Sequence, residues 1–466
     1  MITHAALLAM LAGPALGIQA PPATALREET FTMPAAGEAV GSVAAACRDC
    51  DWGVKGREAA VLVLTVDGRY SQHLILTRGA TAAVYDVMLG TLAAGPHRLR
   101  ITRDPVRSAP AAGAVTVGGV TVRTVAAGSV EHAWLARAPI IYARPGTVEK
   151  FSDLPLMMWA ERTANVDGPG YDYSVIFTHE DGGTPTDRLM ATWGRTTDIE
   201  LLYSADLAVA PSAGGGTYQG KDHEILPFRG RLAGTHPLLW VSTINNMVSD
   251  HGTETVRFAP APRLLPLIDV SREAVMDAQP WTYAVMAAEL AREGRIREDA
   301  EPGSAQVPDP RRFAYLEGCA DVKDAVFAFD VGLMSAAGAM AWYPTDRGDP
   351  RFRLARTGCF RAALPLPRGT APSQIRGVRL RAYTRPPRQG ETALPSGAGS
   401  VVLRRINTVF MMDDHYVPGP PALTWSGRVE AVGNGAAATV PAGELRIRQE
   451  LNRPGNVVPP APPGLH

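Results

Sequence analysis

The chain has 466 residues, 46% of them hydrophobic, and its 46 basic residues balance 46 acidic ones. This length exceeds one ordinary core and predicts two to four domains, while the apolar content excludes a disordered chain. A formal net charge of zero gives no support to a nucleic-acid partner or to an anionic membrane surface.

Turn-forming residues are spread along the whole chain, with 46 glycines and 39 prolines between short apolar runs. This pattern predicts a mainly β, multidomain protein. We expect β-sandwich modules flanking a β-rich middle domain, with one or two helices after the middle domain.

The first twenty residues, 1–20, are apolar and small and end in Ile18-Gln19-Ala20 before two prolines. This resembles a secretory signal peptide with its cleavage site. No later run approaches the roughly 18–20 apolar residues of a membrane helix. We therefore expect an exported protein, secreted or periplasmic, without a membrane span.

The four cysteines are Cys47, Cys50, Cys319 and Cys359, and they allow three pairings. In an exported chain the simplest arrangement pairs Cys47 with Cys50 and Cys319 with Cys359, each within one domain. A redox role for the first pair lacks a surrounding βαβ pattern. A zinc site of four cysteines would require two distant domains to meet, so two disulfides are expected.

Residues 28–130 are predicted to form an N-terminal β-sandwich. The apolar run 59–66 and the returning run 72–76 flank an Asp-Gly turn, which is typical of a hairpin. The segment 103–128 is rich in Ala, Gly, Val and Pro, and it predicts a linker with one short strand pair.

The end of this module, 92–101, resembles the accessory β-sandwich modules of exported carbohydrate-active proteins. That resemblance implies either a structural spacer or a glycan-binding module. Trp52 and Tyr70 are the aromatic candidates for stacking on a sugar, and each could equally belong to the core.

Residues 138–262 are predicted to form the β-rich middle domain. Its clearest strands, 175–177, 199–203 and 238–241, are almost continuously apolar. Such runs predict strands that are buried on both faces.

The middle domain resembles vacuolar-protein-sorting-associated type domains, whose biochemistry is unassigned. The resemblance is carried by APIIY, LPLMMWAE, the Asp198-Ile199-Glu200 strand, HPLLWVS and His251-Gly252. The chain departs from that pattern at Ile199, where the family has Trp, at Leu201, where it has His, and at Asn245-Asn246, near its Gly-Ser. The resemblance implies one domain with a shared polar site, and it supplies no reaction.

Residues 267–297 are predicted to be helical. Ser271 is suited to cap a first helix, and Pro280 to begin a second one in which apolar residues recur at helical spacing. Strand patterns return at 313–448 and predict a C-terminal β-sandwich, followed by an extended tail, 449–466.

The stretch 171–254 holds the candidate site. Asp198 and Glu200 lie two apart on a predicted strand and therefore share a face, where their pKa values would split to give an acid and a base. A structural ion pair with Arg188 or Arg195 is the alternative.

Three histidines of this stretch, each beside a carboxylate, are candidates for proton transfer: His179, His223 and His251. The residues predicted to bind substrate are Arg188, Trp193, Arg195, Lys221, Asn245 and Asn246. No cofactor is certain. The carboxylates of Glu180, Asp181 and Asp187 beside two glycines suggest a Ca²⁺ loop, with an ordinary polar turn as the alternative.

Two functions fit these patterns. The first is an exported polysaccharide-active enzyme: either a glycoside hydrolase with paired carboxylates, or a lyase with a His or Tyr base and an Arg or Ca²⁺ on a uronate. The second is a non-catalytic cell-envelope or glycan-binding protein. The partner is then a carbohydrate or a cell-envelope polymer. A metal-dependent esterase or phosphatase is a third possibility, whereas missing Gly-x-Ser-x-Gly and His-Glu-x-x-His motifs argue against common α/β-hydrolases and zincins.

Overall fold

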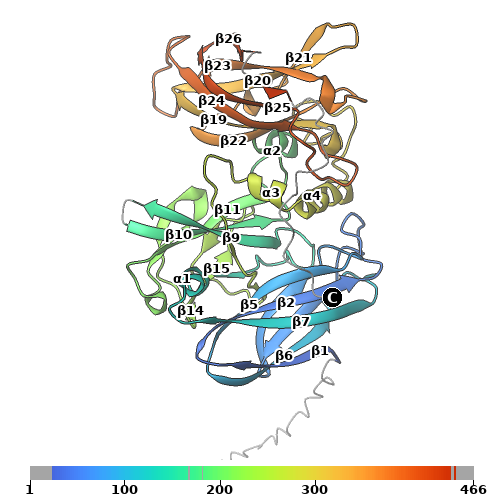
Figure 1. The fold of residues 1–466 in the computed structure, drawn as a ribbon, viewed down its shortest axis with the longest axis vertical. Coiled ribbons are helices and arrows are strands. Elements are labelled where there is room, and N and C mark those ends of the chain that lie inside the picture. Colours follow the sequence, from blue (N-terminus) through green and yellow to red (C-terminus); the bar gives the residue numbers. More distant parts are fainter. Residues whose placement is uncertain (1–23, 166–167, 181, 442–445, 448–466) are drawn as a thin grey trace, which may run out of the picture.

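The computed structural model is mainly β, as predicted. Three β-rich regions follow one another along the long axis of the molecule (Figure 1). The structure describes residues 24–165, 168–180, 182–441 and 446–447. The predicted signal peptide and the predicted C-terminal tail lie outside these residues.

The N-terminal sandwich packs a four-stranded sheet against a three-stranded one. Val43, Leu62 and Ile101 are among the residues that fill the core between the two sheets. In sheet order the strands are β1 (Ala25–Met33), β6 (Gly95–Asp104), β3 (Val61–Val66) and β4 (Arg69–Ile75), then β5 (Ala83–Leu92), β2 (Gly37–Cys47) and β7 (Val115–Ala126).

The predicted linker 103–128 instead contributes a full strand. β7 pairs with β2 from Gly37 to Cys47, so it is an integral part of the sandwich. The strand is rich in Val and Thr, and less exposed residues alternate with exposed ones along it, as suits a strand with one face against a core.

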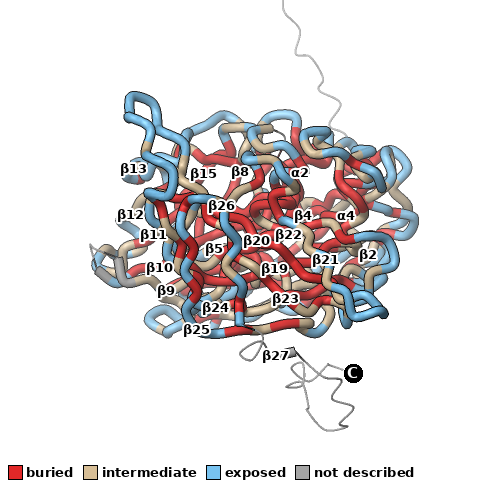
Figure 2. Tube along the Cα trace, turned by 90° about the horizontal axis from the view of Figure 1, so that it is seen from above, coloured by how far each residue is buried: buried red, intermediate tan, exposed pale blue. Residues whose placement is uncertain are grey.

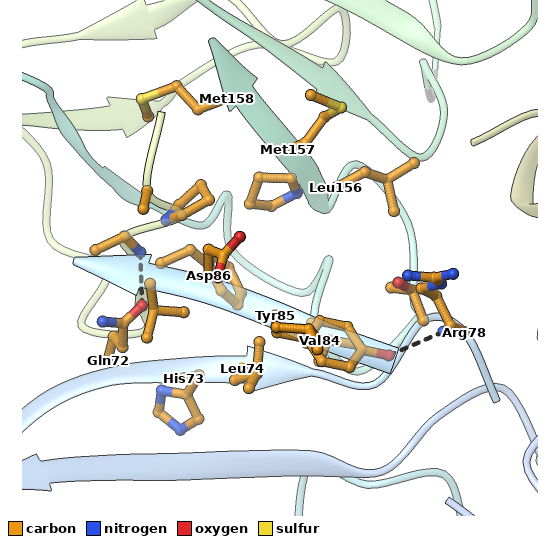
Figure 3. A pocket seen from close by; sticks show the side chains of 18 of the residues that line it. Gln72, His73, Leu74, Arg78, Val84, Tyr85, Asp86, Leu156, Met157 and Met158 are labelled. Carbon is orange, nitrogen blue, oxygen red and sulfur yellow. Dashed lines mark hydrogen bonds between the residues drawn. The ribbon is translucent and has the colours of Figure 1, made fainter. Parts of the chain in front are cut away.

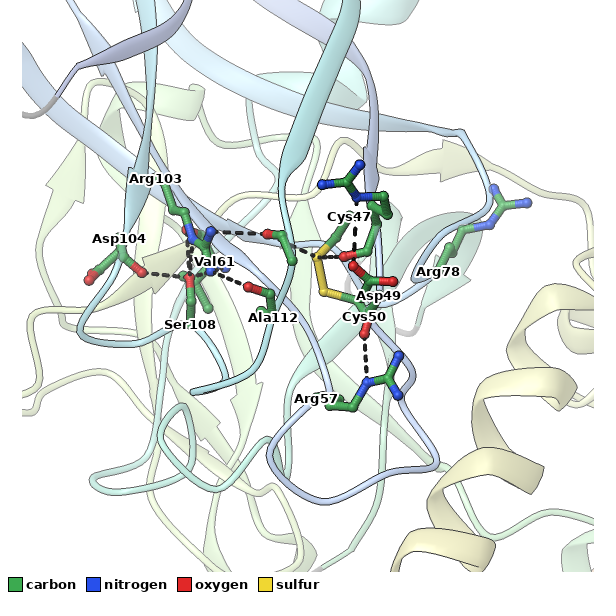
Figure 4. Close-up of a disulfide and its surroundings, with 12 residues drawn as sticks. Cys47, Asp49, Cys50, Arg57, Val61, Arg78, Arg103, Asp104, Ser108 and Ala112 are labelled. Carbon is green, nitrogen blue, oxygen red and sulfur yellow. Dashed lines mark hydrogen bonds and ion pairs between the residues drawn. A yellow bond between two sulfur atoms is a disulfide. The ribbon is translucent and has the colours of Figure 1, made fainter.

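A disulfide between Cys47 and Cys50 closes the end of β2, as predicted (Figure 4). Beside it, the Arg103 guanidinium donates to the carbonyl oxygens of Ala112 (2.9 Å) and Gly113 (3.0 Å). The turn that leads into β7 is thereby held next to the disulfide.

The two aromatic residues considered for sugar stacking have other partners. Trp52 is only 3% exposed, and its Nε1 donates to the Glu289 carboxylate at 2.5 Å. Tyr70 lies under the guanidinium of Arg257, and its hydroxyl accepts from the Arg257 backbone N–H at 3.1 Å. Trp52 is therefore part of the buried contact between the N-terminal sandwich and the segment that contains Glu289.

The middle region contains two sheets around a core that includes Tyr173, Leu202 and Leu239. Every residue of β15 is buried, as its apolar run predicts. A short helix, α1 (Val130–Leu135), leads into this region. One sheet has the order β13 (Ile225–Pro227), β12 (Gly216–Gln219), β11 (Asp198–Asp206), β10 (Gly168–Phe177), β9 (Pro155–Asn165), β18 (Arg263–Leu264). The other has β14 (Leu232–Ala233), β15 (His236–Val241), β8 (Ile140–Tyr142) and β17 (Arg257–Phe258), with β16 (Val248–Ser249) on β15.

The first two regions are joined by backbone hydrogen bonds between β5 and the segment after β17. The Met88 N–H donates to the Ala259 carbonyl at 2.8 Å, and the Gln72 side chain bridges the same two residues. A cavity of about 90 Å³ remains at this junction, between β5 and the Met157–Met158 segment (Figure 3). The N-terminal sandwich is thus packed onto the middle region.

The helical segment 267–297 lies between the middle region and the C-terminal sandwich. It forms α3 (Ala274–Ala278) and α4 (Trp281–Arg292), and Pro280 stands just before α4, as predicted. Ser271 does not cap a helix, because its hydroxyl donates to Glu317 at 2.9 Å. Figure 1 shows these helices, together with α2 (Thr186–Trp193), between the two regions.

The C-terminal sandwich has a dense aromatic core that includes Phe327, Phe329 and Phe360, and its inner strands are largely buried (Figure 2). The predicted Cys319–Cys359 disulfide joins β19 and β22, where the two residues face each other in register. One sheet has the order β22 (Gly358–Pro365), β19 (Phe313–Lys323), β24 (Ser400–Phe410), β25 (Leu423–Val432), β27 (Arg446–Ile447). The other has β21 (Met340–Pro344), β20 (Ala325–Met334), β23 (Ile375–Thr384), β26 (Asn434–Thr439).

Among the described residues, no helix combines the length and the apolar character that crossing a membrane requires.

Candidate functional site

A cleft of about 470 Å³ opens where β10 ends and β11 begins. Its walls come from the loop after β10, from α2, from the β12–β13 hairpin and from two more distant loops. Seven of the residues proposed from the sequence line it: Glu180, Trp193, Arg195, Asp198, Glu200, His223 and Asn245. The cleft therefore brings together much of the predicted site.

The start of β11 supplies the two central carboxyl groups. Asp198 is in register with Phe177 and Glu200 with Val175 on the neighbouring β10. Because side chains alternate along a strand, Asp198 and Glu200 lie on the same face. A hydrogen bond joins the two side chains.

Asp198 is deeply buried and firmly held. Asn246 Nδ2 donates to its Oδ2 at 3.0 Å, and the Arg195 guanidinium lies 3.7 Å from its Oδ1. Burial raises the pKa of Asp198, although Arg195 acts against this shift. Asp198 therefore holds the side chains of Asn246 and Arg195 in place.

Glu200 is more accessible than Asp198 and carries the larger perturbation. Burial and the adjacent Asp198 carboxylate raise the pKa of Glu200 well above its usual value of 4.5. Two like charges in hydrogen-bonding contact cannot both ionise easily, so the last proton of the pair is held more tightly than the first. We assign that proton to Glu200.

Glu180 is the third carboxyl group of the cleft. Burial and the charge of Asp198 raise its pKa to about 7. The Thr184 backbone N–H donates to its Oε1 at 2.9 Å and fixes its orientation. The cleft thus holds one carboxyl group with a pKa of about 7 beside a pair of carboxyl groups whose pKa values are raised.

The charge of Arg195 is already balanced by groups within the protein. Its Nε donates to Glu273 at 3.2 Å, just before α3. Burial alone would raise the pKa of Glu273, but the guanidiniums of Arg195 and Arg356 hold it below its usual value. Arg195 is therefore a structural partner of Asp198 and Glu273, the alternative considered from the sequence.

Trp193 and His223 form the rim of the cleft. Trp193 is half-buried at the end of α2, with the Arg356 guanidinium 5.0 Å from the ring centre. His223 is exposed, and Gln219 Nε2 donates to its Nδ1 at 2.6 Å. Positive φ angles at Asp222 (59°) and His223 (62°) turn the chain there, so the alternation of a regular strand does not apply.

Five of the residues predicted for catalysis or substrate binding do not line the cleft. Asn246 and His179 are buried behind it, where Asn246 also donates to the His179 carbonyl at 3.0 Å. Arg188 and Lys221 are exposed on other sides of their short helices. His251 lines a separate surface pocket with Tyr218 and Trp240. Tyr218 and its neighbour Gln219, which lines the cleft, point to opposite faces of β12, so the strand separates the two pockets.

Two of the three predicted Ca²⁺ ligands, Glu180 and Asp187, make separate contacts. Asp187 lies in the first turn of α2, and its carboxylate accepts from the Gly303 N–H at 2.5 Å, while Glu180 faces the cleft. Asp181 lies outside the described residues. Within the part of the chain that the structure describes, no three His, Cys, Asp or Glu side chains are placed to hold a metal ion.

Three contributors to the site were missed in the sequence. Arg272 and Gln219 line the cleft, and Glu273 holds Arg195. Arg272 and Glu273 follow Ser271, where the sequence indicated only the start of a helix. No local pattern connects them with β11, which lies some 70 residues earlier in the chain.

No protein-family model matches the sequence, and no curated protein matches it. Among solved structures, the chain is similar to one described as the EclA C-terminal domain, a sugar-binding protein. The match has 17% sequence identity, covers 22% of this chain and 68% of that chain, and has a TM-score of 0.18. The resemblance to vacuolar-protein-sorting-associated type domains stays a prediction.

Proposed function

We propose that the protein is an exported glycoside hydrolase and that the cleft is its active site. The observation that carries this proposal is the meeting of three carboxyl groups, Glu180, Asp198 and Glu200, in one cleft of about 470 Å³. That volume falls in the range of small-molecule sites. Acid–base cleavage of a glycosidic bond requires one carboxyl group that gives a proton and another that accepts one.

The three groups divide these roles according to their surroundings. Glu200, whose pKa is raised well above its usual value by burial and by Asp198, gives its proton to the glycosidic oxygen as the C–O bond breaks. Glu180, which ionises at about pH 7, takes a proton from the water whose oxygen bonds to the anomeric carbon. Asp198 is a positioning residue that accepts the hydrogen bond of Glu200.

The charge of the cleft favours hydrolysis over a lyase reaction. A lyase must neutralise the carboxylate of a uronate, usually with a free cation. Here three carboxyl groups face two guanidiniums, and Arg195 is already paired with Asp198 and Glu273. Arg272 is the remaining arginine of the lining. A neutral sugar therefore suits the cleft better than an acidic one, and Trp193 offers it an aromatic wall.

The two disulfides support export, because such bonds persist mainly in oxidising compartments. The alternative function, a non-catalytic glycan-binding protein, is favoured by one observation. Asp198 has its hydrogen bonds and ion pair satisfied inside the protein, as a purely structural carboxylate would.

The experiment is a hydrolysis assay on neutral polysaccharides, with reducing ends as the readout. Wild type should release them, and Glu200→Gln and Glu180→Gln should each lose at least 100-fold in kcat. Glu224→Gln is the matched control and should retain activity, because Glu224 is an exposed carboxyl group on the β12–β13 hairpin that flanks the cleft. Products should show inverted anomeric configuration, because Glu180 activates water directly.

Two results would oppose the proposal. If wild type releases no reducing ends from a broad neutral panel yet binds one of its polymers, the non-catalytic alternative holds. If Glu200→Gln and Glu180→Gln remain fully active, the cleft is not the active site.

A further inference from the structure

A second concave site lies on the C-terminal sandwich, far along the chain from the cleft. It has a volume of about 230 Å³ and sits on the outer face of the sheet β21-β20-β23-β26. The residues that matter for its chemistry are Asp330, Trp342, Asp346, Arg353, Arg381 and Tyr383.

The site is built around the ring of Trp342. Trp342 is in register with Gly332 on β20, and Gly332 is in register with Gly377 on β23. A Cβ atom at either glycine would lie 2.9 Å from the Trp342 ring. The two glycines therefore let the ring lie flat across the sheet. On the ring, the Arg379 guanidinium is stacked 3.7 Å from the centre.

Two further guanidiniums are held in place and neutralised. Arg353 lies 3.4 Å from the centre of the Tyr383 ring, and its Nε donates to Asp346 at 3.0 Å. Arg381 Nε donates to Asp330 at 2.8 Å, and the Arg381 side chain remains 34% exposed. Both carboxylates are almost fully buried, so these pairs form a rigid, neutral wall.

Arg379 is the guanidinium that remains uncompensated. It shares the outer face of β23 with Arg381, two residues further on. Among the described residues, no carboxylate lies within ion-pair distance of it, and its buried Nε has no hydrogen-bond partner. Arg379 does not line the cavity itself but lies beside it, on the ring of the lining residue Trp342. With Arg379 included, three guanidiniums and two carboxylates leave one positive charge on this face of the sheet.

We propose that this site binds an acidic saccharide, with the sugar carboxylate paired to Arg379. A guanidinium suits a carboxylate because its planar donors match the two oxygens. The polar groups of the cavity wall suit the hydroxyls of a sugar ring, which need hydrogen-bonding partners. The proposal does not depend on the chemistry of the cleft.

The test measures binding of the full chain to oligogalacturonate and to its methyl ester by calorimetry. The acidic oligomer should bind, and the ester, which has the same backbone without the charge, should bind at least tenfold more weakly. Arg379→Met should weaken binding at least tenfold, and Arg379→Lys, which keeps the charge, should weaken it less. Arg404→Met is the matched control, since Arg404 is half exposed on the other sheet beside Asp321. It should bind as wild type does.

Several outcomes would overturn the proposal. These are equal binding of oligomer and ester, unchanged affinity in a folded Arg379→Met variant, or no binding of oligogalacturonate and alginate oligomers. Sulfate that binds as tightly as the oligomer, with the same dependence on Arg379, would show an anion site without sugar recognition. Unchanged binding in Glu200→Gln separates this result from the fate of the proposed hydrolase.

Discussion

Glu289 offers a direct test of the packing between the N-terminal sandwich and α4. Its carboxyl group is about 1% exposed, accepts from Trp52 Nε1 at 2.5 Å and pairs with Arg292. Burial raises its pKa from the ordinary 4.5 to about 7, with Arg292 and the Trp52 hydrogen bond acting in the opposite direction. We expect this shift to appear as a pH dependence of stability.

The sign follows from which state holds the proton. As the pH rises from about 4.5 to about 7, the unfolded carboxyl group ionises first while the folded one stays protonated, so folding becomes less favourable. Above about pH 7 both states are ionised and the effect levels off. A difference between 4.5 and about 7 corresponds to about 3 kcal/mol, at about 1.4 kcal/mol per pH unit.

The assay compares wild type with Glu289→Gln by urea unfolding at pH 4.5, 6 and 7.5. The glutamine side chain does not titrate. The free energy of unfolding of the variant, relative to that of wild type, should therefore increase by about 3 kcal/mol as the pH rises across this range. Glu293→Gln is the control, because Glu293 is on the same helix segment, 3.6 Å from Arg292, with a side chain 35% exposed. A constant difference for Glu289→Gln would refute the reasoning and would mean that Arg292 keeps Glu289 ionised in the folded protein.

Three further predictions concern the core, the disulfide and the rim of the cleft. Phe329→Ala should cost about 3–5 kcal/mol of unfolding free energy, measured by denaturant titration, because the ring is fully buried among Phe327 and Phe360. Replacing Cys319 and Cys359 together by Ser should cost about 2–5 kcal/mol and lower the Tm in calorimetry, and reducing agent should then act on that variant only through the remaining Cys47–Cys50 disulfide. Trp193→Ala should weaken binding of a neutral oligosaccharide roughly tenfold, and Trp193→Phe should restore most of it; equal affinity of all three proteins would remove Trp193 from the binding site.

The parts of the site that follow from local periodicity were predictable. Asp198 and Glu200 share a face because strand alternation holds at the start of β11. The disulfides were also predictable, because the cysteines that pair lie within the same predicted domain and the chain was expected to be exported to an oxidising compartment. By contrast, α2 was missed because Pro185 and its neighbours have the composition of a polar loop. Packing against β22, which is remote in sequence, decides that this segment is a helix.

The other differences arise from contacts between distant segments. His251 and His223 are both polar residues on loops, yet they lie on opposite sides of the β12–β13 hairpin. Trp52 is of a residue type that often binds sugars on a surface, but here it is covered by α4, which lies more than 200 residues later in the chain. Arg272 reaches the cleft only because α3 packs there. Single-sequence patterns carry no information about such pairings.

The helical segment has a consequence for how this protein can change over generations. It supplies a buried or half-buried carboxylate to each β-rich region: Glu289 to Trp52, Glu273 to Arg195, and Asp277 to Arg361 at 2.8 Å. Sandwich modules that are joined by exposed, flexible linkers are readily exchanged between proteins, because few contacts cross their boundaries. Here, loss of any one region would leave a carboxylate of the helical segment without its hydrogen-bond or ion-pair partner. We therefore expect the three β-rich regions and the helical segment to have been inherited together rather than exchanged separately by gene fusion.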